Sequence, residues 1–551
     1  MGSKFCSFNV YGGNPAAVEK LCPGLGIRAA APGWITAACD DGDWDAMRKT
    51  ARRLSKELAR PVLYTEYFDD DFVDFSVYRD GKRAARHVPA EYEGFPRVPG
   101  RPRMWRELFG LPPETEKTLR TVFGETNPER SLRLLECVLG CPLWVDGEFL
   151  DDIELPDPAY LEAYLMQKSA EKKIKNVTKL TLLDEREGNF CYARNTYPVF
   201  RQETGDPKYW EEGGNRKSVW AIRDGKLEQL FEAELPGMVK TAFAGEGIFM
   251  VLIDQLCRDA DGNPIPSESD FFTYECRNRA YVFSEEGRLL ETLDFQVNDY
   301  VPVGGFLDRD RLFLNGICRS IRTHTQEWAL AESGVYILGQ SGRLADGRLA
   351  VLYETGEHSE MYLASFRPDG SERVVRGLPR SRFGSCLLAY RDGILLGHRR
   401  ELVCYDTFLK ERWRMELWEE EGSFREMRLD GLSEMLYLDS YDLILSIDLK
   451  KRQIRASRKF AEGECCYLQD VLPGVGAVML TGDSAIQVWD AGLTPVSRHR
   501  TKGAVIQTLP WNGNLCAVTD MDPVDDFRKV GDDYEIVRIR EGRLRLYELK
   551  K

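Results

Sequence analysis

Residues 177–551 repeat one short pattern of apolar and polar positions. An apolar stretch leads into a turn with Gly, Asp or Asn, and a second apolar stretch follows the turn. Three examples are WAIRDGKLEQLF (220–231), YVFSEEGRLLETL (281–293) and IVRIREGRLRLYEL (536–549). Such alternation around a tight turn is typical of β-hairpins. We therefore expect this region to consist of strands, with almost no helix.

The turns recur about every forty residues, apart from three longer intervals that carry insertions. A second hairpin precedes most of them, as in SCLLAYRDGILLGHR (385–399). Two hairpins per repeat predict a four-stranded sheet that is copied along the chain. The centres of the repeated units are Gly225, Gly287, Ser333, Gly370, Leu409, Lys450, Gly492 and Gly542.

A four-stranded sheet cannot bury both of its faces alone, whereas copies arranged around an axis bury them against one another. Over residues 177–551 the pattern resembles the β-propeller superfamily, broadly its WD-repeat and quinoprotein-like members. The stretch IQVWDAG (486–492) holds one WD-type dipeptide, Trp489 and Asp490, but the companion Gly-His pair is missing. The resemblance implies an all-β propeller. Eight four-stranded blades fit the count best, and seven remain if the weak unit near Ser333 is not a blade.

Residues 1–98 alternate strand and helix patterns, which predicts a small α+β domain. The region 43–59 has apolar residues at steps of three and four, the pattern of an amphipathic helix that packs on a sheet. The residues of this apolar stripe are Trp44, Met47, Ala51, Leu54 and Leu58.

Residues 99–176 predict a helical segment that ends in a linker. Helical patterns cover 101–110, 113–124 and 127–140, and each ends in glycine, the favoured left-handed stop. A further helix is expected near 157–173, before the basic stretch that leads to the propeller. The chain is thus expected to be multidomain.

The bulk composition narrows the class of partner and the compartment. The net charge of −14 repels phosphate backbones, so nucleic acid is not expected as a partner. No run of about 18 apolar residues and no export signal is present, so no membrane partner is expected. The 14 cysteines are scattered through apolar stretches, which favours reduced thiols and a cytoplasmic location.

No recognised catalytic motif emerges from the sequence. The five histidines are far apart, and no phosphate-binding or nucleophile-elbow motif lies between a strand and a helix. The stretch YETGEHSEMY places His358 beside Glu354, Glu357 and Glu360, but its position between two strands of one blade predicts a solvated turn. We expect no cofactor and no catalytic metal.

One weak calcium candidate is the stretch DADGN. Asp259, Asp261 and Asn263 offer oxygen ligands, but Gly262 is the fourth residue of the stretch, whereas an EF-hand loop needs glycine at its sixth position. A polar insertion between strands is the preferred interpretation.

A candidate interaction surface lies at the start of the helical segment. Arg101, Arg103, Trp105 and Arg106 combine arginine with tryptophan, a composition found at protein interfaces. A solvated helix start is the alternative.

Two functions follow from these observations. The first is an intracellular binding or scaffold protein that displays a propeller surface to a protein partner. The second is a propeller-type hydrolase or lyase with carboxylates gathered at the axis. Because propellers host both kinds of function, the fold does not decide between them. The absence of catalytic motifs favours the first.

Overall fold

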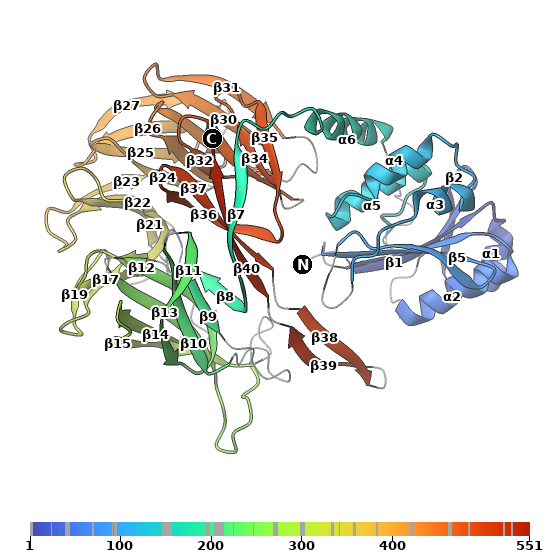
Figure 1. Cartoon of the computed structure of the whole chain (residues 1–551), viewed down its shortest axis with the longest axis horizontal. Helices are drawn as coiled ribbons and strands as arrows, with labels where there is room; N and C mark the ends of the chain where they lie inside the picture. The colour runs from blue at the N-terminus through green and yellow to red at the C-terminus, as the bar shows by residue number, and fades with distance from the viewer. Residues whose placement is uncertain are drawn as a thin grey trace. The chain divides into compact units, whose positions relative to one another are not determined.

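The structure is a computed structural model of the 551-residue chain. It describes all residues except 1–3, 24, 39–43, 69–70, 91, 93–95, 146–156, 193–198, 203–213, 224, 246, 268–273, 298–303, 332–334, 341, 356–359, 382–383, 419–421, 461–465, 483–484, 522–523, 531–532 and 541. The chain forms two compact units, which divide between Ile174 and Lys175 and are described separately below (Figure 1).

The first unit is built on a six-stranded antiparallel sheet with the order β2-β3-β1-β4-β5-β6. The strands are β1 (Lys4–Tyr11), β2 (Gly26–Ala31), β3 (Trp34–Ala38), β4 (Val62–Phe68), β5 (Phe72–Arg79) and β6 (Lys82–His87). The helices are α1 (Pro15–Leu21), α2 (Trp44–Glu57), α3 (Pro102–Leu108), α4 (Thr115–Val122), α5 (Pro128–Leu139) and α6 (Pro158–Glu171).

Helix α2 packs on one face of this sheet through the predicted apolar stripe. Met47, Ala51 and Leu54 are buried in one cluster with residues of β1, β3, β4 and β5, which confirms the prediction for these three positions. Leu58 is partly buried against the same cluster, and the Trp44 side chain lies outside the described residues.

The opposite face of the sheet is also covered, which the sequence did not predict. Trp105 of α3, Leu119 of α4 and Leu132 of α5 share a single core with Phe5 and Phe75 of the sheet. Successive residues of a strand point to opposite faces, so a sheet covered on both sides buries nearly every strand position. The first unit is therefore a sheet between two helical layers, and the helical segment belongs to its core.

Truncating Leu54 to alanine should destabilise the first unit strongly. The side chain is fully buried, and a buried leucine truncated to alanine costs about 2–5 kcal/mol in the free energy of unfolding. Denaturant unfolding of the full chain measures the effect. The exposed Lys49 on the same helix provides the control, and Lys49→Ala should stay within about 0.5 kcal/mol. Equal losses for the two variants would show that the stripe is not core.

Among its described residues, the second unit contains eight four-stranded antiparallel sheets and no α-helix. The first four sheets comprise β8 (Asn189–Tyr192), β9 (Val199–Gln202), β10 (Arg216–Arg223), β11 (Lys226–Glu234); β12 (Met238–Gly245), β13 (Ile248–Leu256), β14 (Cys276–Ser284), β15 (Leu289–Val297); β16 (Gly304–Phe306), β17 (Arg311–Leu314), β18 (Ile317–Ser320), β19 (Gln326–Ala329); and β20 (Val335–Gln340), β21 (Leu349–Thr355), β22 (Glu360–Phe366), β23 (Val374–Leu378).

The remaining sheets continue the same order along the chain. They comprise β24 (Cys386–Tyr390), β25 (Gly393–His398), β26 (Glu401–Asp406), β27 (Glu411–Glu416); β28 (Glu426–Asp430), β29 (Met435–Asp439), β30 (Leu443–Asp448), β31 (Gln453–Lys459); β32 (Cys466–Leu472), β33 (Gly476–Thr481), β34 (Ala485–Trp489), β35 (Pro495–Arg500); and β36 (Ala504–Trp511), β37 (Asn514–Met521), β40 (Arg543–Lys550) with β7 (Lys179–Glu187). A separate hairpin, β38 (Val524–Val530) and β39 (Asp533–Arg540), is inserted before β40.

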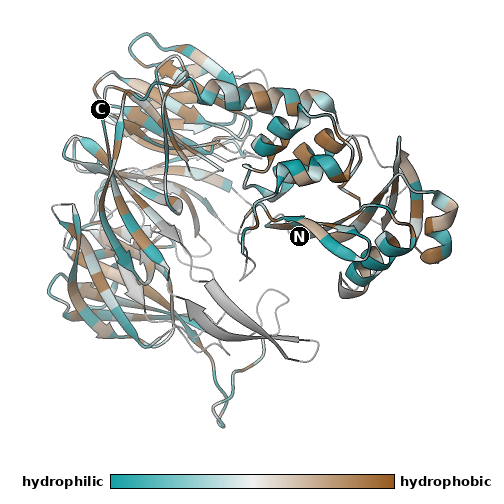
Figure 2. Cartoon of the chain, turned by 45° about the vertical axis from the view of Figure 1, so that its right-hand side comes forward, coloured by the Kyte–Doolittle hydropathy of each residue, from teal (hydrophilic) through white to brown (hydrophobic). Residues whose placement is uncertain are grey.

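The last sheet closes a ring. Strand β7, from the start of the unit, pairs with β40, from its end, along the register Lys179↔Lys550 to Glu187↔Arg543. The first strands of consecutive sheets also contact one another, as β24 does β28 and β28 does β32. Figure 2 shows apolar and polar bands alternating along these strands. The faces of neighbouring sheets also share cores, as those of β24–β27 and β28–β31 do. Sheets that pack face to face around an axis and are closed by a terminal strand form a β-propeller.

Two of the predicted hairpins are wrong. The unit near Ser333 was expected to join two strands of one blade, but β19 and β20 belong to different sheets and β19 pairs with β18. The unit around Gly542 fails similarly, because β39 pairs with β38 while β40 pairs with β37 and β7. An apolar–turn–apolar pattern does not distinguish a hairpin from a connection between sheets.

The Trp489–Asp490 dipeptide belongs to a structural repeat. Asp406, Asp448 and Asp490 follow one another at intervals of 42 residues, each at the turn between the third and fourth strands. The carboxylates of Asp406 and Asp490 accept hydrogen bonds from backbone N–H groups two and four residues ahead, and Asp448 accepts one from three residues ahead. These aspartates cap turns, which is a structural role.

Candidate functional site

One end of the propeller carries the groups best suited to binding. At this end the first strands of the sheets begin, and the second and third strands turn at residues 399–400 and 440–442. We call it the entry end. Two features lie there, an arginine-lined groove and a patch of two tyrosines around an arginine.

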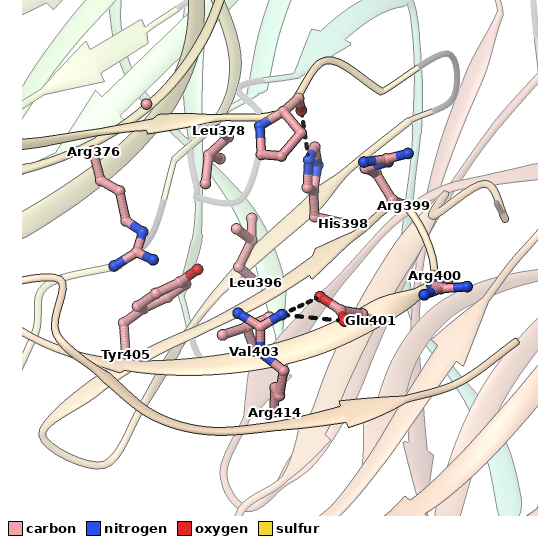
Figure 3. A pocket seen from close by; sticks show the side chains of 12 residues that line it. Arg376, Leu378, Leu396, His398, Arg399, Arg400, Glu401, Val403, Tyr405 and Arg414 are labelled. Carbon is pink, nitrogen blue, oxygen red and sulfur yellow. Dashed lines mark hydrogen bonds and ion pairs between the residues drawn. The ribbon is translucent and has the colours of Figure 1, made fainter.

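The arginine groove lies between β23 of one sheet and β25, β26 and β27 of the next, and its volume is about 460 Å³ (Figure 3). Because side chains alternate along a strand, β25 and β26 each contribute every second residue. The lining residues are Arg376, Gly377, Leu378, Pro379, Leu396, His398, Arg399, Arg400, Glu401, Val403, Tyr405 and Arg414. A space of this size matches the smaller ligand pockets of proteins.

The arginines of the groove differ in how their charge is balanced. Arg414 donates to Glu401 at 3.0 and 3.2 Å and to Glu411 at 2.7 and 2.9 Å. Arg376 lies 5.1 Å from the centre of the Tyr405 ring and donates to the Leu409 carbonyl at 3.3 Å. Within the described part of the chain, no carboxylate forms an ion pair with Arg376. Arg414 is the main cause that lowers the pKa of Glu411, and the Arg376 charge adds to this effect from a longer distance. Because Arg376 is not held in an ion pair, it can pair with an anionic ligand.

His398 holds the two walls of the groove together. Its ring is buried, with Nε2 at 2.8 Å from the Pro379 carbonyl and Nδ1 at 2.9 Å from the Ser385 hydroxyl. Because a carbonyl oxygen only accepts, Nε2 donates to Pro379 and Nδ1 accepts from Ser385. The histidine thus joins β25 to the segment that follows β23, and its role is positional.

The tyrosine patch consists of Tyr441, Tyr467 and Arg425. Tyr441 is 73% exposed and Tyr467 is 45% exposed. The Arg425 guanidinium lies 4.5 Å from the centre of the Tyr467 ring and 5.7 Å from that of Tyr441. Tyrosine and arginine, together with tryptophan, are the residues most enriched among the strongest contacts of protein interfaces.

A buried carboxylate fixes the arginine of this patch. Asp439 is fully buried and accepts from Arg425 at 2.6 and 2.9 Å and from the Leu468 N–H at 2.9 Å. Burial raises the pKa of Asp439, while the Leu468 N–H and the Arg425 charge oppose that rise. Arg425 also donates to the Cys466 carbonyl at 2.6 Å. The patch is therefore preorganised before any partner binds.

Two carboxylates occupy the innermost strands. Glu426 of β28 pairs with Arg428 at 2.9 Å, and Asp470 of β32 accepts from the Val471 N–H at 2.8 Å and from the Thr508 hydroxyl at 2.9 Å. Burial raises the pKa of both carboxyl groups. A carboxyl with a raised pKa could act as a general acid, which is the feature expected of the hydrolase or lyase alternative.

The predicted interaction residues of the first unit lie partly in the core and partly at the start of α3. Trp105 is fully buried in the core, so its side chain does not reach the surface. Arg103 and Arg106 donate to Glu107 at 2.8 and 3.2 Å, and Arg101 is the residue that precedes α3. A binding role for these arginines stays a prediction.

The calcium candidates form a capped turn. One oxygen of Asp259 accepts from the N–H groups of Asp261 and Asn263 at 2.9 and 2.8 Å. The Asn263 N–H is the main cause that lowers the pKa of Asp259. Within the described ranges, no group of three or more His, Cys, Asp or Glu is placed to hold a metal ion. Glu357 and His358 lie outside the described residues. The Glu360 carboxylate accepts a hydrogen bond from the Tyr362 hydroxyl.

The groove and the patch were not identified from the sequence. The sequence GHRREL contains Arg399 and Arg400 next to each other. They form a groove only together with residues such as Arg376 and Arg414, which come from other strands. Asp439 and Arg425 are 14 residues apart and meet only because β28 pairs with β29. Finding this pair from the sequence would have required the pairing register of β28 and β29.

The described part of the chain contains no helix long and apolar enough to cross a membrane. No family model matches the chain, and no curated protein matches it.

Similar solved structures exist, at low identity. The C-terminal WD40 domain of Sif2 is 12% identical with a TM-score of 0.40, and the match covers 67% of this chain and 99% of that one. BamB from Moraxella catarrhalis is 10% identical with a TM-score of 0.40, over 67% and 100% of the two chains. Kluyveromyces lactis Hsv2 is 8% identical with a TM-score of 0.35, over 57% and 99%. The propeller assignment rests on the strand pairing and ring closure of this chain.

Proposed function

We propose that this chain is an intracellular, cytoplasmic scaffold whose eight-bladed propeller binds a protein partner at its entry end. The observation that carries the proposal is the patch of Tyr441, Arg425 and Tyr467. A cytoplasmic location is supported by the described cysteines, which are free thiols and mostly buried.

The chemistry of the patch suits a protein partner. Tyrosine side chains bury a large area on binding and lose little conformational entropy, because each has two rotatable angles. The buried Asp439 neutralises the guanidinium, so burying the patch under a partner does not isolate a charge. The rigid propeller keeps the geometry fixed, which lowers the entropic cost of binding.

The test compares variants of the full chain in partner binding. A partner captured from native extract is purified, and its affinity is measured for the wild type and for Tyr441→Ala/Tyr467→Ala. A tyrosine at the centre of an interface is worth about 2 kcal/mol, which is about 30-fold in affinity. The double variant should therefore bind at least about 30-fold more weakly, and about 900-fold more weakly if the two losses add. Leu432→Ala is the control, because Leu432 is 75% exposed but lies at the opposite end, in the turn between β28 and β29.

An unchanged affinity of the double variant, or an equal loss in Leu432→Ala, would place the partner elsewhere. Circular dichroism of each variant shows whether the fold is retained.

A second candidate function is a hydrolase or lyase, favoured by the raised pKa of Glu426 and Asp470. Both carboxylates also serve internal hydrogen bonds, which is why binding is the preferred function. Turnover of a panel of glycans by the wild type that is lost in Glu426→Gln would support the enzyme instead.

A further inference from the structure

The arginine groove has three zones along its length. Arg376 and Tyr405 lie together at one end, and Arg399 and Arg400 lie at the other (Figure 3). Leu378 lies between them, with Leu396 and Val403 as the buried floor beneath. The groove is thus basic at both ends, and its middle combines this apolar floor with the Glu401–Arg414 ion pair, which already balances its own charge.

The strand register sets the distance between the two basic ends. Glu401, Val403 and Tyr405 line the groove as successive inward-facing residues of β26, and His398 opposite Glu401 precedes Arg399. Tyr405 lies beside Arg376, and Glu401 directly follows Arg399 and Arg400. The four-residue step from Glu401 to Tyr405 along the strand spans about 13 Å. An extended peptide has the same rise, so side chains four residues apart would reach the two ends.

The charges favour carboxylates at those positions. Within the described ranges no carboxylate forms an ion pair with Arg376, and Arg399 and Arg400 are exposed in the turn. Arg400 lies 3.3 Å from Glu416 at the rim, where an exchange of ion-pair partners costs little. Arginine binds a carboxylate through two parallel hydrogen bonds, which gives direction as well as charge attraction.

We propose that the groove binds an extended segment of a protein partner in which two acidic residues, four positions apart, flank a central apolar residue. This inference rests on the proposed protein-binding function and names the chemistry of the partner. Inorganic phosphate would match the ends but leave the apolar middle unfilled.

The experiment measures the binding of a fluorescent peptide to the full chain by anisotropy. The probe is an uncharged-ended Ser-Glu-Ser-Leu-Ser-Glu-Ser peptide. We expect saturable binding that weakens at least tenfold when both Glu are changed to Gln, and that also weakens when Leu is changed to Ser. Higher salt should weaken binding, because the ends of the groove are exposed.

Two protein variants test the site itself. Arg376→Gln should weaken the peptide about tenfold, whereas Arg391→Gln should not, because Arg391 is paired with Glu434 at the turn between β24 and β25. Because the peptide series uses wild-type protein, the proposal stays falsifiable even if Arg376→Gln does not fold.

Several results would overturn the inference. They are equal binding of the Gln-substituted peptide, equal binding of the peptide by Arg376→Gln, and displacement of the peptide by millimolar phosphate or by vesicles of anionic lipid. The Tyr441→Ala/Tyr467→Ala variant should bind the peptide as the wild type does. A partner that needs the tyrosines, together with no peptide binding, would remove the groove proposal and leave the proposed function standing.

Discussion

Deleting β40 should abolish the cooperative folding of the second unit. The strand lies between β37 and β7 and closes the ring, and it carries the fully buried Leu544, Leu546 and Leu549. Each buried leucine contributes about 2–5 kcal/mol, so together they are worth about 6–15 kcal/mol, as much as the whole stability of a typical domain. Thermal melts followed by circular dichroism measure the change.

The hairpin of β38 and β39 supplies the control for this deletion. Its two strands pair with each other and with no other described strand, while Met521 and Arg543 on either side of it are paired in the last sheet. Replacing residues 524–540 by an Asn-Gly turn should therefore preserve the ring. A hairpin deletion as damaging as the loss of β40 would contradict closure through β7 and β40.

Asp439→Ala should destabilise the second unit by about 3 kcal/mol, near the lower limit for removing one partner of a buried ion pair. The substitution removes the acceptor of Arg425 and of the Leu468 N–H. The lower limit applies because Arg425 is 23% exposed and can turn towards water. Denaturant unfolding of the full chain gives the value.

Two companion variants separate charge from general damage at this position. Asp442→Ala changes an exposed aspartate three residues away and should cost less than about 0.5 kcal/mol. Asp439→Asn keeps the size of the side chain but removes its negative charge, which weakens the ion pair with Arg425. This variant should therefore reduce partner affinity while the fold persists. If Asp439→Ala is as stable as Asp442→Ala, the carboxylate does not organise the patch.

The propeller could be predicted because each repeat is defined by residues that are close together in the sequence. Each hairpin is defined by apolar alternation and by turn residues such as Asp490, which the chain places next to each other. The assignment of strands to sheets was harder, since the connection from β19 to β20 has the same apolar–turn–apolar form as a hairpin. Pairing partners decide that distinction, and they lie outside any local window.

The candidate site could not be predicted for a related reason. Arg376, Arg399 and Arg414 come from three different segments of two sheets, so their proximity depends on how the sheets pack. Trp105 shows the opposite case. Its arginine neighbours suggested a surface, but a tryptophan of an amphipathic helix packs inward when a sheet face is available.

Hydrogen exchange of the full chain, with and without its captured partner, tests the central claim of binding at the entry end most directly. The account predicts slower exchange on binding in the turn at residues 440–442 and at the start of β32, around Tyr467. Slower exchange confined to the first unit, or to the turns between β24 and β25 and between β28 and β29, would contradict it.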